Sequence, residues 1–386
     1  MHCILWIILE LVVEANTLKI ETFYYNAPSK IKADGYPVEI HNVLTKDGYI
    51  LEIHRIPFSP KNKSERKQAI FMQHGLYATG DNFILADPSQ AIAYLAADAG
   101  YDVWLGNNRG TFYSKKNIYF SPSNPLFWNF TFGETSVYDV SASIDYILNI
   151  TQQNKIHYLG HSLGTTSYLV LLSMRPEYNS KIKSGHLLAP ISAIKNLKTP
   201  IGKVLSPIFG HPDPDRSYTG FEFLPHFLPL NIFLANFCAQ PGILSICKAV
   251  ISLYIGPSKK YTNDSLVPVI FATFPGGSSY NEGIHLTQMV NTKRFQMFDW
   301  EQYGSKVPPE FPIENVQAPT FFYYSSGDYL SSELDVENLL KSLNKDVVAG
   351  TWFKDDGEWS HFDYLAANDL KTILNDDILE NIRKFD

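Results

Sequence analysis

The sequence predicts an α/β protein whose central sheet is mainly parallel, and three observations lead to this prediction. A Gly-His-Ser-Leu-Gly segment at residues 160–164 lies between a β-prone run, 156–159, and an apolar helical segment. Two later strand-like runs, 320–324 and 350–354, each lead into a polar loop. The long, proline-rich interval 192–318 lies between these two parts of the chain, as expected of a segment that leaves a sheet and returns to it.

The Gly-x-Ser-x-Gly pattern at residues 160–164 is the strongest functional signal. A nucleophilic serine must project from a tight, strained turn between a strand and a helix, and Ser162 occupies that position. Side chains larger than hydrogen at Gly160 and Gly164 would clash with the neighbouring strand and helix. The pattern therefore predicts that Ser162 is the nucleophile of a hydrolase, with an ordinary glycine-rich turn as the alternative.

A serine hydrolase of this kind also needs an acid and a base, which follow the serine in the order acid, then histidine. Asp328 follows the run 320–324 through a Ser-Ser-Gly turn, and the only histidine beyond it is His361. His361 occupies a loop after the run 350–354, where α/β folds place functional side chains. We therefore predict Asp328 as the acid and His361 as the base, with Asp335, in a predicted helix, as the rival acid.

The oxyanion hole is expected to consist of two backbone N–H groups. Residues 70–73 read as a strand and lead into His-Gly-Leu. One N–H is therefore expected from Leu76 and the other from Leu163, directly after the nucleophile. His74 precedes the serine in the chain, and we expect it to shape this loop rather than to act on the substrate.

Three further residues are better interpreted as parts of the scaffold. Arg109, after the strand-like run 102–105, is expected to form a buried ion pair that fixes its loop, with contact to substrate as the alternative. His161, beside the nucleophile, is expected to pack or hydrogen-bond locally. Asp363, two residues after His361, is expected to cap or salt-bridge the final helix, with a pairing to His361 as the alternative.

Several motifs together resemble those of a known family. They are Asp-Gly-Tyr-Ile-Leu at 47–51, Gln-His-Gly-Leu at 73–76, Ala-Asp-Ala-Gly-Tyr-Asp-Val-Trp-Leu-Gly-Asn-Asn-Arg-Gly at 97–110, Gly-His-Ser-Leu-Gly-Thr-Thr at 160–166, Gly-Asp-Tyr-Leu at 327–330 and Ser-His-Phe-Asp at 360–363. With these motifs the chain resembles the animal acid lipases, the family of gastric lipase and lysosomal acid lipase, and more loosely its insect members. The match extends from about residue 22 to the C-terminus, and the block at 97–110 is its most specific part.

This resemblance implies an α/β-hydrolase fold in which Ser162 is the nucleophile, Asp328 the orienting acid and His361 the general base. Two departures are visible. The family often has Gln after the serine, where this chain has Leu163, a change that keeps the N–H but alters the polarity of the pocket. The family's second acid, four residues past the triad Asp, is Ser332 here, which bears on local structure rather than on the triad.

The stretch 223–247 contains no Asp, Glu, Lys or Arg. Its prolines and polar residues leave too few uninterrupted apolar residues for a transmembrane helix. We expect a lid at about 223–253 that opens an apolar face onto a lipid surface, with a buried helix pair as the alternative. The resemblance places this lid in a mostly helical cap at residues 192–318, inserted into a core formed by residues 16–191 and 319–386.

The length and composition of the chain agree with a single large α/β enzyme. The 386 residues are long for a single domain but can bury a substantial core. Charged residues make up 18%, against about 25% in a typical soluble domain, so the surface should carry few charges. A net charge of −7 and the lack of any basic run argue against nucleic-acid binding, and we expect a monomer.

The N-terminus predicts a cleaved export signal at residues 1–15, because the mostly apolar run 4–13 precedes the small residue Ala15. The run is too short to span a membrane, and a membrane-anchored or buried N-terminal segment is the alternative. We therefore expect a secreted or lysosomal protein. Four Asn-x-Ser/Thr sequons support export, with glycosylation expected at Asn62, Asn129, Asn149 and Asn263.

Cysteine usage fits the same compartment. If Cys3 leaves with the signal, Cys238 and Cys247 remain as an even pair, and an oxidising lumen should join them in one disulfide. Two buried free thiols are the alternative. No His/Cys cluster has the spacing of metal ligands, so no metal site is expected.

The sequence therefore predicts serine-dependent hydrolysis of carboxylic esters of neutral lipids, through an acyl-enzyme and without a cofactor. The expected substrates are triacylglycerols, cholesteryl esters or both, met at a lipid–water interface. Two alternatives stay open: a carboxylesterase that acts on soluble esters, and a catalytically silent, lipid-binding homologue.

Overall fold

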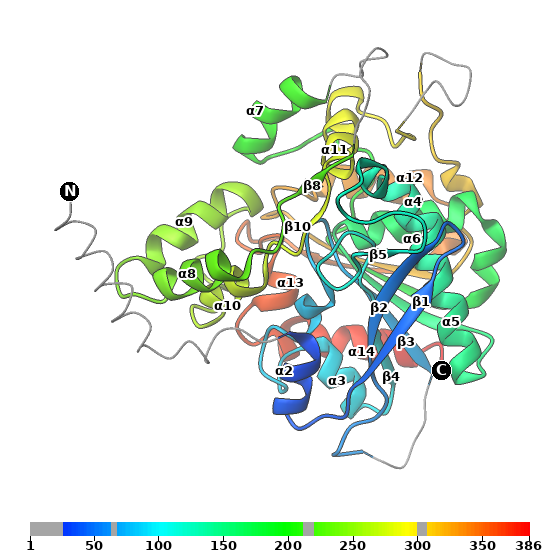
Figure 1. The fold of residues 1–386 in the computed structure, drawn as a ribbon, viewed down its shortest axis with the longest axis horizontal. Helices are drawn as coiled ribbons and strands as arrows, with labels where there is room; N and C mark the ends of the chain where they lie inside the picture. Colours follow the sequence, from blue (N-terminus) through cyan, green and yellow to red (C-terminus); the bar gives the residue numbers. More distant parts are fainter. Residues whose placement is uncertain (1–25, 63–67, 211–219, 299–306) are drawn as a thin grey trace.

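The computed structural model describes residues 26–62, 68–210, 220–298 and 307–386, and in these ranges nine strands form one mixed sheet (Figure 1). Its order is β1-β2-β4-β3-β6-β7-β10-β11, and the short β5 pairs with β2. The pairs β1–β2, β2–β4 and β2–β5 are antiparallel, whereas every neighbouring pair from β4 to β11 is parallel. The strands are β1 (Glu39–Leu44), β2 (Tyr49–Ile56), β3 (Ala69–Gln73), β4 (Asp102–Leu105), β5 (Lys116–Asn117), β6 (Ile156–His161), β7 (Ile182–Leu188), β10 (Thr320–Ser325) and β11 (Val348–Lys354).

Helices cover both faces of this sheet, which explains why its central strands are apolar throughout rather than alternating. Successive side chains of a strand point to opposite faces. Accordingly, Ile70 and Met72 of β3 pack into one core, and Phe71 packs into the other. The first core includes side chains of α2 (Ala27–Ala33), α3 (Ile92–Asp98), α13 (Asp363–Ala366) and α14 (Asp376–Arg383); the second includes side chains of α4 (Phe132–Glu134), α5 (Ser141–Thr151), α6 (Leu163–Met174) and α12 (Glu333–Ser342).

The parallel strands end at a common edge, and the predicted functional residues follow four of these ends. His74 follows β3, Ser162 follows β6, Asp328 lies in the turn after β10, and His361 lies in the loop after β11. All five predicted strand-like runs are strands in the structure, with bounds that agree to within two residues. In an open α/β sheet this edge is where ligands bind.

The chain leaves the sheet after Leu188 and returns at Thr320, although β7 and β10 are direct parallel neighbours with Thr320 opposite Gly185. In Figure 1 the intervening helices gather beyond the sheet, with α8, α9 and α10 forming one projecting group. The elements described in this interval are α7 (Pro200–Phe209), β8 (Glu222–Phe223), α8 (Leu228–Cys238), α9 (Leu244–Ile255), α10 (Leu266–Thr273), β9 (Ser278–Ser279) and α11 (Tyr280–Thr292).

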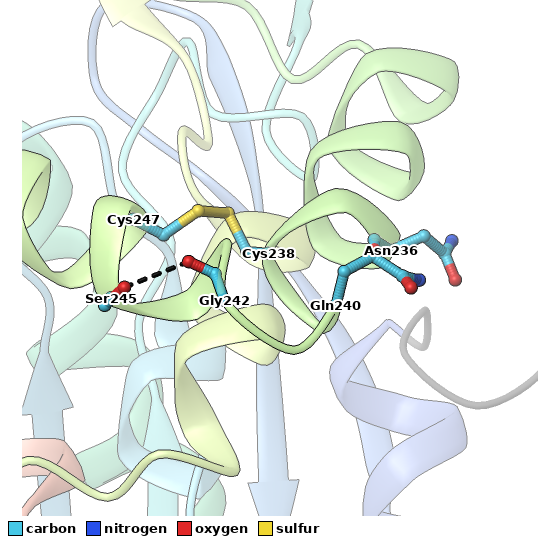
Figure 2. The surroundings of a disulfide bond; sticks show 6 residues. All are labelled: Asn236, Cys238, Gln240, Gly242, Ser245 and Cys247. Atoms are coloured by element: carbon cyan, nitrogen blue, oxygen red, sulfur yellow. Dashed lines mark hydrogen bonds between the residues drawn. A yellow bond between two sulfur atoms is a disulfide. The ribbon is translucent and has the colours of Figure 1, made fainter.

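The uncharged stretch forms α8 and the start of α9, and the Pro-Gly turn between them includes Gly242 at φ +85°. Cys238 and Cys247 join the two helices in the predicted disulfide (Figure 2), so the free-thiol alternative is wrong. Inside the pair, Asn231 donates hydrogen bonds to two backbone carbonyls at the end of α10. No helix of the described ranges is long and apolar enough to cross a bilayer.

The outer faces of α8 and α9 are apolar and open to solvent, so the alternative of an ordinary buried helix pair is wrong. The side chain of Phe233 on α8 is 61% exposed, and that of Ile246 on α9 is 56% exposed. Large apolar patches on a protein surface mark contact sites for proteins, membranes or ligands. The exposed members are Phe227, Leu230, Phe233 and Phe237 at α8, and Ile246, Val250 and Leu253 on α9; we call this set the α8–α9 apolar face.

Candidate active site

Ser162 stands at the sharp turn between β6 and α6. Its backbone has φ +55° and ψ −122°, a conformation that costs a non-glycine residue about 1–3 kcal/mol and is found mostly at functional sites. A Cβ on Gly164 would lie 2.1 Å from the carbonyl oxygen of Gln73, and one on Gly160 would lie 2.7 Å from the carbonyl oxygen of Gly164. The two glycines therefore allow the turn to pack against β3 and against its own helix, as the sequence pattern predicts.

The three residues predicted as nucleophile, base and acid are joined by hydrogen bonds. The Nε2 atom of His361 lies 2.7 Å from the Oγ of Ser162, and its Nδ1 lies 2.8 Å from Oδ2 of Asp328. Asp328 is completely buried, and its other oxygen, Oδ1, accepts the backbone N–H groups of Leu330 and Ser331, each at 2.8 Å. These two N–H groups orient the carboxylate so that Oδ2 faces the imidazole.

The backbone of His361 is held from two sides. Its N–H donates to the carbonyl of Ile255, the last residue of α9, at 3.2 Å. Its own carbonyl oxygen lies 2.9 Å from Nε2 of His161, which donates to it. Burial lowers the pKa of His161 to about 3, so this ring is neutral and serves as a local donor, as predicted.

The rival acid, Asp335, is engaged elsewhere. Its Oδ2 accepts the backbone N–H groups of Lys195 and Asn196, and its Oδ1 accepts the side-chain amide of Asn196 at 2.7 Å. Asp335 lies in the first turn of α12 and fixes the start of the inserted segment. The carboxylate within reach of His361 is therefore that of Asp328.

The loop after β3 packs directly against the nucleophile. A Cβ on Gly75 would lie 2.9 Å from the Cβ of Ser162, and Leu76 and Leu163 line one cavity together with Ser162. Leu163 is the first residue of α6, and the first N–H groups of a helix have no acceptor inside it. The assignment of the Leu76 and Leu163 N–H groups to an oxyanion hole stays a prediction that this arrangement accommodates.

His74 shapes the loop, as predicted. The N–H of Asn108 donates to its Nε2 at 3.1 Å, so the ring proton is on Nδ1, which donates to the carbonyl of Gly75 at 2.7 Å. Burial lowers the pKa of His74 to about 4 and keeps the ring neutral. The histidine thus joins the ends of β3 and β4.

Arg109 forms the predicted buried ion pair. Its guanidinium binds Asp139 through Nε at 2.8 Å and through Nη2 at 2.6 Å, and it also binds Asp47. The ring of Tyr49 lies 3.8 Å from its Cζ, a cation–π contact. A fully paired, 1% exposed guanidinium fixes the β4 loop to the β1–β2 hairpin and is not available to a substrate.

A cavity of about 120 Å³ opens beside Ser162. It extends between the ends of the core strands and the inserted helices, so both parts of the chain contribute to its wall. A substrate group held here would contact hydrocarbon on most sides, which suits an acyl chain. Its apolar lining consists of Leu76, Leu163, Ile191, Ile194, Leu197, Tyr254, Leu286, Val290 and Leu330.

Sequence reasoning missed two contacts of the histidine loop. Asp363 does not serve the final helix as expected, because its carboxylate accepts the N–H of Ser360 at 2.6 Å and the hydroxyl of Ser258 at 2.8 Å. The carbonyl of Ile255 was not a candidate either, since no side-chain pattern marks a backbone acceptor. Within the described ranges no group of His, Cys, Asp and Glu could hold a metal ion.

Comparison with known proteins gives matches over most of the chain. The family model described as a partial α/β-hydrolase lipase region matches residues 28–87, and that of the α/β hydrolase fold matches residues 68–241. Lipase 3 of Drosophila melanogaster is 37% identical and the alignment covers 92% of each chain. Gastric triacylglycerol lipase of Rattus norvegicus is 35% identical over 87% of this chain and 86% of its own. The human lysosomal acid lipase/cholesteryl ester hydrolase is 32% identical, and the alignment covers 91% of this chain and 89% of the relative.

Solved structures agree at the level of the fold. A putative lipase from Sulfolobus solfataricus superposes with a TM-score of 0.55 at 14% identity, covering 90% of this chain and 99% of its own. A putative lipase from Acinetobacter baumannii gives a TM-score of 0.52 at 13% identity, and the superposition covers 92% of this chain and 95% of that lipase. Together with the identities to the curated relatives, the sheet order and the strand–turn–helix at Ser162 lead to one conclusion. This chain has the α/β-hydrolase fold and belongs to the animal acid lipase family.

Proposed function

We propose that the protein hydrolyses carboxylic esters of neutral lipids, with Ser162 as nucleophile, His361 as general base and Asp328 as the acid that orients it. The observation that carries this proposal is the continuous hydrogen-bonded chain from the Ser162 hydroxyl through His361 to the buried Asp328 carboxylate. The names of the relatives, gastric triacylglycerol lipase and lysosomal acid lipase/cholesteryl ester hydrolase, support it and point to triacylglycerols and cholesteryl esters as the substrate class.

The reaction follows from this geometry. As the Oγ of Ser162 attacks the acyl carbonyl, Nε2 of His361 takes the hydroxyl proton, and Asp328 stabilises the imidazolium that forms. The N–H groups of Leu76 and Leu163 hold the oxyanion of the tetrahedral intermediate, and the loss of one such donor typically costs about 10²–10³ in turnover. His361 then protonates the leaving alcohol. A water molecule activated by His361 attacks the acyl-enzyme and releases the fatty acid.

The inserted part of the chain supplies the contact with lipid in this proposal. The predicted cap at 192–318, inserted into the core at 16–191 and 319–386, includes the α8–α9 apolar face within the proposed lid at about 223–253. An apolar face that is exposed in water becomes favourable to bury when a lipid surface is present. Lipid at an interface is therefore the partner, and the enzyme acts as a monomer without a cofactor.

We place the protein in the secretory pathway, either secreted or lysosomal. The relatives named gastric and lysosomal support this placement, as does the disulfide between Cys238 and Cys247. The predicted signal at residues 1–15 lies outside the described ranges. Of the proposed glycosylation sites, Asn129 and Asn149 are exposed, whereas Asn62 and Asn263 are half-buried.

The test is an assay of the purified protein on triolein and cholesteryl oleate emulsions from pH 4 to 8, with Ser162→Ala as control. We expect wild-type hydrolysis of at least one emulsion, and a fall of about 10⁶ in turnover for Ser162→Ala, because the nucleophile of a triad cannot be replaced by its partners. Activity that survives the substitution would favour a lipid-binding homologue with a contaminating hydrolase as the source of the signal.

A soluble-ester carboxylesterase is the second candidate, and the small volume of the cavity beside Ser162 favours it. The two candidates differ at the interface. A lipase gains rate when its ester passes from monomers to an emulsion, whereas a carboxylesterase shows saturation below the solubility limit and no further rise. Tributyrin, measured on both sides of its solubility limit, distinguishes them.

A further inference from the structure

We propose that residues 255–258, which we call the clamp segment, position the general base by holding the His361 loop and the Asp328 loop in one arrangement. The clamp segment begins at the last residue of α9 and belongs to the inserted part of the chain. The insertion is then a component of the catalytic geometry as well as a cover for the site. This inference deepens the proposed function and rests on it.

One backbone carbonyl joins the two loops. The oxygen of Ile255 accepts the N–H of His361 and the N–H of Tyr329, each at 3.2 Å. Ile255 is the last residue of α9, and the final carbonyls of a helix have no partner inside it. Because Tyr329 directly follows Asp328, a single atom at the end of α9 contacts the backbone of both halves of the Asp–His pair.

Gly256 brings the clamp segment into direct backbone contact with the acid loop. Its φ of +108° lies in a region that L side chains rarely adopt, and a Cβ here would lie 2.3 Å from the carbonyl oxygen of Gly327. Gly327 immediately precedes Asp328. The absence of a side chain at residue 256 thus sets how closely the end of α9 approaches the acid.

Ser258 connects the clamp segment to the histidine loop through side chains. Its hydroxyl donates to Oδ1 of Asp363 at 2.8 Å, and Oδ2 of Asp363 accepts the N–H of Ser360 at 2.6 Å. Ser258 and Asp363 are both buried, so water does not replace either bond readily. Since Ser360 precedes His361, the Asp363 carboxyl bridges the clamp segment to the residue next to the base.

The chain beyond the clamp segment continues along the same loop. The ring of Tyr261 packs edge-on against Trp359 with centroids 5.0 Å apart, and its hydroxyl donates to Asp356. Its carbonyl accepts the N–H of Asn368 at 2.8 Å. These contacts attach the inserted part of the chain to residues before and after His361. We therefore expect the clamp segment and the histidine loop to move as one unit.

The physical consequence concerns the distance over which a proton is transferred. Nε2 of His361 lies 2.7 Å from the Ser162 hydroxyl, and a misplacement of about 1 Å can cost on the order of 10²-fold in rate. His161 anchors the His361 carbonyl from the core, and Ile255 anchors its N–H from the insertion. Loosening the second anchor should lower turnover while leaving substrate binding in place.

The experiment measures hydrolysis of p-nitrophenyl butyrate, a soluble ester, by the full-length protein well below the unfolding temperature of each variant. Ser258→Ala removes the hydroxyl, and we expect kcat to fall about tenfold with KM unchanged. Ser258→Thr keeps the hydroxyl, and a cavity of about 30 Å³ beside Ser258 and Asp363 leaves room for the methyl group, so it should recover most of kcat. Ser180→Ala, which removes an exposed hydroxyl bonded to the Glu177 carbonyl, is the matched control and should behave as wild type.

A second pair of variants covers the case in which Ser258→Ala fails to fold. Asp363→Asn can still accept the Ser360 N–H and can donate to the Ser258 hydroxyl, so it should keep kcat within about twofold. Asp363→Ala loses both bonds and should lower kcat about tenfold, again at constant KM.

The outcomes separate this inference from the proposed function. Wild-type kcat in Ser258→Ala or Asp363→Ala, even with a lower unfolding temperature, overturns the positioning role and leaves the proposed function standing if Ser162→Ala is inactive. A rise in KM alone overturns it as well, because that result indicates a binding role. If the wild-type protein shows no Ser162-dependent ester hydrolysis, both proposals fall.

Discussion

At the scale of single residues, the geometry of the candidate active site is set by the different partners of the two Asp328 oxygens and of the two His361 nitrogens. Oδ1 of Asp328 is occupied by two backbone donors, and Oδ2 is left for Nδ1 of His361. In the proposed mechanism, the carboxylate keeps the imidazole proton on Nδ1 and leaves Nε2 free to accept the proton of Ser162. The rigid turn at Ser162 supplies the matching geometry from the other side.

We expect Asp328→Asn to lower kcat by about 10⁴ without unfolding the protein. The amide oxygen would occupy the place of Oδ1, because that position accepts the N–H groups of Leu330 and Ser331. The NH2 group would then face His361, forcing the ring proton onto Nε2, where it blocks proton transfer from Ser162. Steady-state kinetics on p-nitrophenyl butyrate checks the prediction. Asp335→Asn, at the rival carboxylate, should stay within about tenfold of wild type, and a loss there as large as at Asp328 would contradict the assignment.

At the scale of elements, the α8–α9 pair combines a fixed inner side with an exposed outer side. Asn231 attaches α8 to the end of α10, and the disulfide joins α8 to α9 (Figure 2). Cys238 and Cys247 are buried in a small core with Val267 of α10, whereas the side chains of the α8–α9 apolar face are exposed to solvent. Exposing such residues costs stability in water, and in the proposed function burial of the face in lipid recovers that cost.

Removing two aromatic rings from this face should weaken lipid binding selectively. Phe233 and Phe237 are 61% and 45% exposed and stack on one another with centroids 6.1 Å apart. For the double substitution Phe233→Ser and Phe237→Ser we expect at least tenfold weaker adsorption to a triolein emulsion, because one fully buried ring contributes about 1.5–3 kcal/mol and a tenfold change corresponds to about 1.4 kcal/mol. Adsorption is measured by flotation, and p-nitrophenyl butyrate kinetics should be unchanged.

The control for this prediction is Tyr119→Ser, which removes an aromatic ring that is 69% exposed outside the inserted segment. Equal loss of adsorption in the control would show that any exposed aromatic ring contributes. Unchanged adsorption of the double variant would contradict a role of the α8–α9 apolar face.

At the scale of the whole molecule, buried titratable groups make stability depend on pH in two opposing ways. Burial raises the pKa of Asp81 to about 6 and of Glu282 to about 7, so these carboxyls favour the folded state at low pH, where they are neutral. Burial lowers the pKa of His74 to about 4 and of His285 to about 3, so these rings favour the folded state at higher pH, where they are neutral. Between about pH 4 and pH 6.5, a rise in pH therefore lowers the free energy of unfolding through the two carboxyls and raises it through the two histidines.

The substitution Glu282→Gln tests how much one of these carboxyls contributes to the pH dependence of the free energy of unfolding. Below about pH 4.5 the glutamate is protonated in both the folded and the unfolded chain, so its stabilising effect is fully present there. As the pH rises towards 7, the unfolded chain releases this proton while the folded chain retains it, and the wild-type protein loses stability. The variant, which carries no charge at any pH, should therefore gain in unfolding free energy relative to wild type between about pH 4.5 and 7, by about 1.4 kcal/mol for each unit of pKa shift. Urea denaturation at pH 4.5, 5.5 and 7 measures this difference, and a difference that is constant with pH would contradict the prediction.

Local patterns and chain order were enough to predict much of this protein. The strand–turn–helix at Ser162, the strands before Asp328 and His361, and the pairing of the two cysteines were predicted correctly, because strands, turns and small-residue requirements are encoded over a few neighbouring residues. Family resemblance extended this to the fold, which the sheet order and the relatives confirm. The role of Arg109 was also predicted, since a guanidinium must be paired when it is buried.

Only the tertiary structure decided how the catalytic loops are held. Asp363 was assigned to the final helix, whereas its carboxylate bridges Ser360 and Ser258, a residue 105 positions earlier in the chain. The sequence also left open whether the α8–α9 apolar face is exposed. An apolar helix has the same sequence pattern whether it packs on a core or faces solvent. Such contacts depend on where distant segments meet in space, and a backbone carbonyl such as that of Ile255 leaves no signature in the amino-acid sequence.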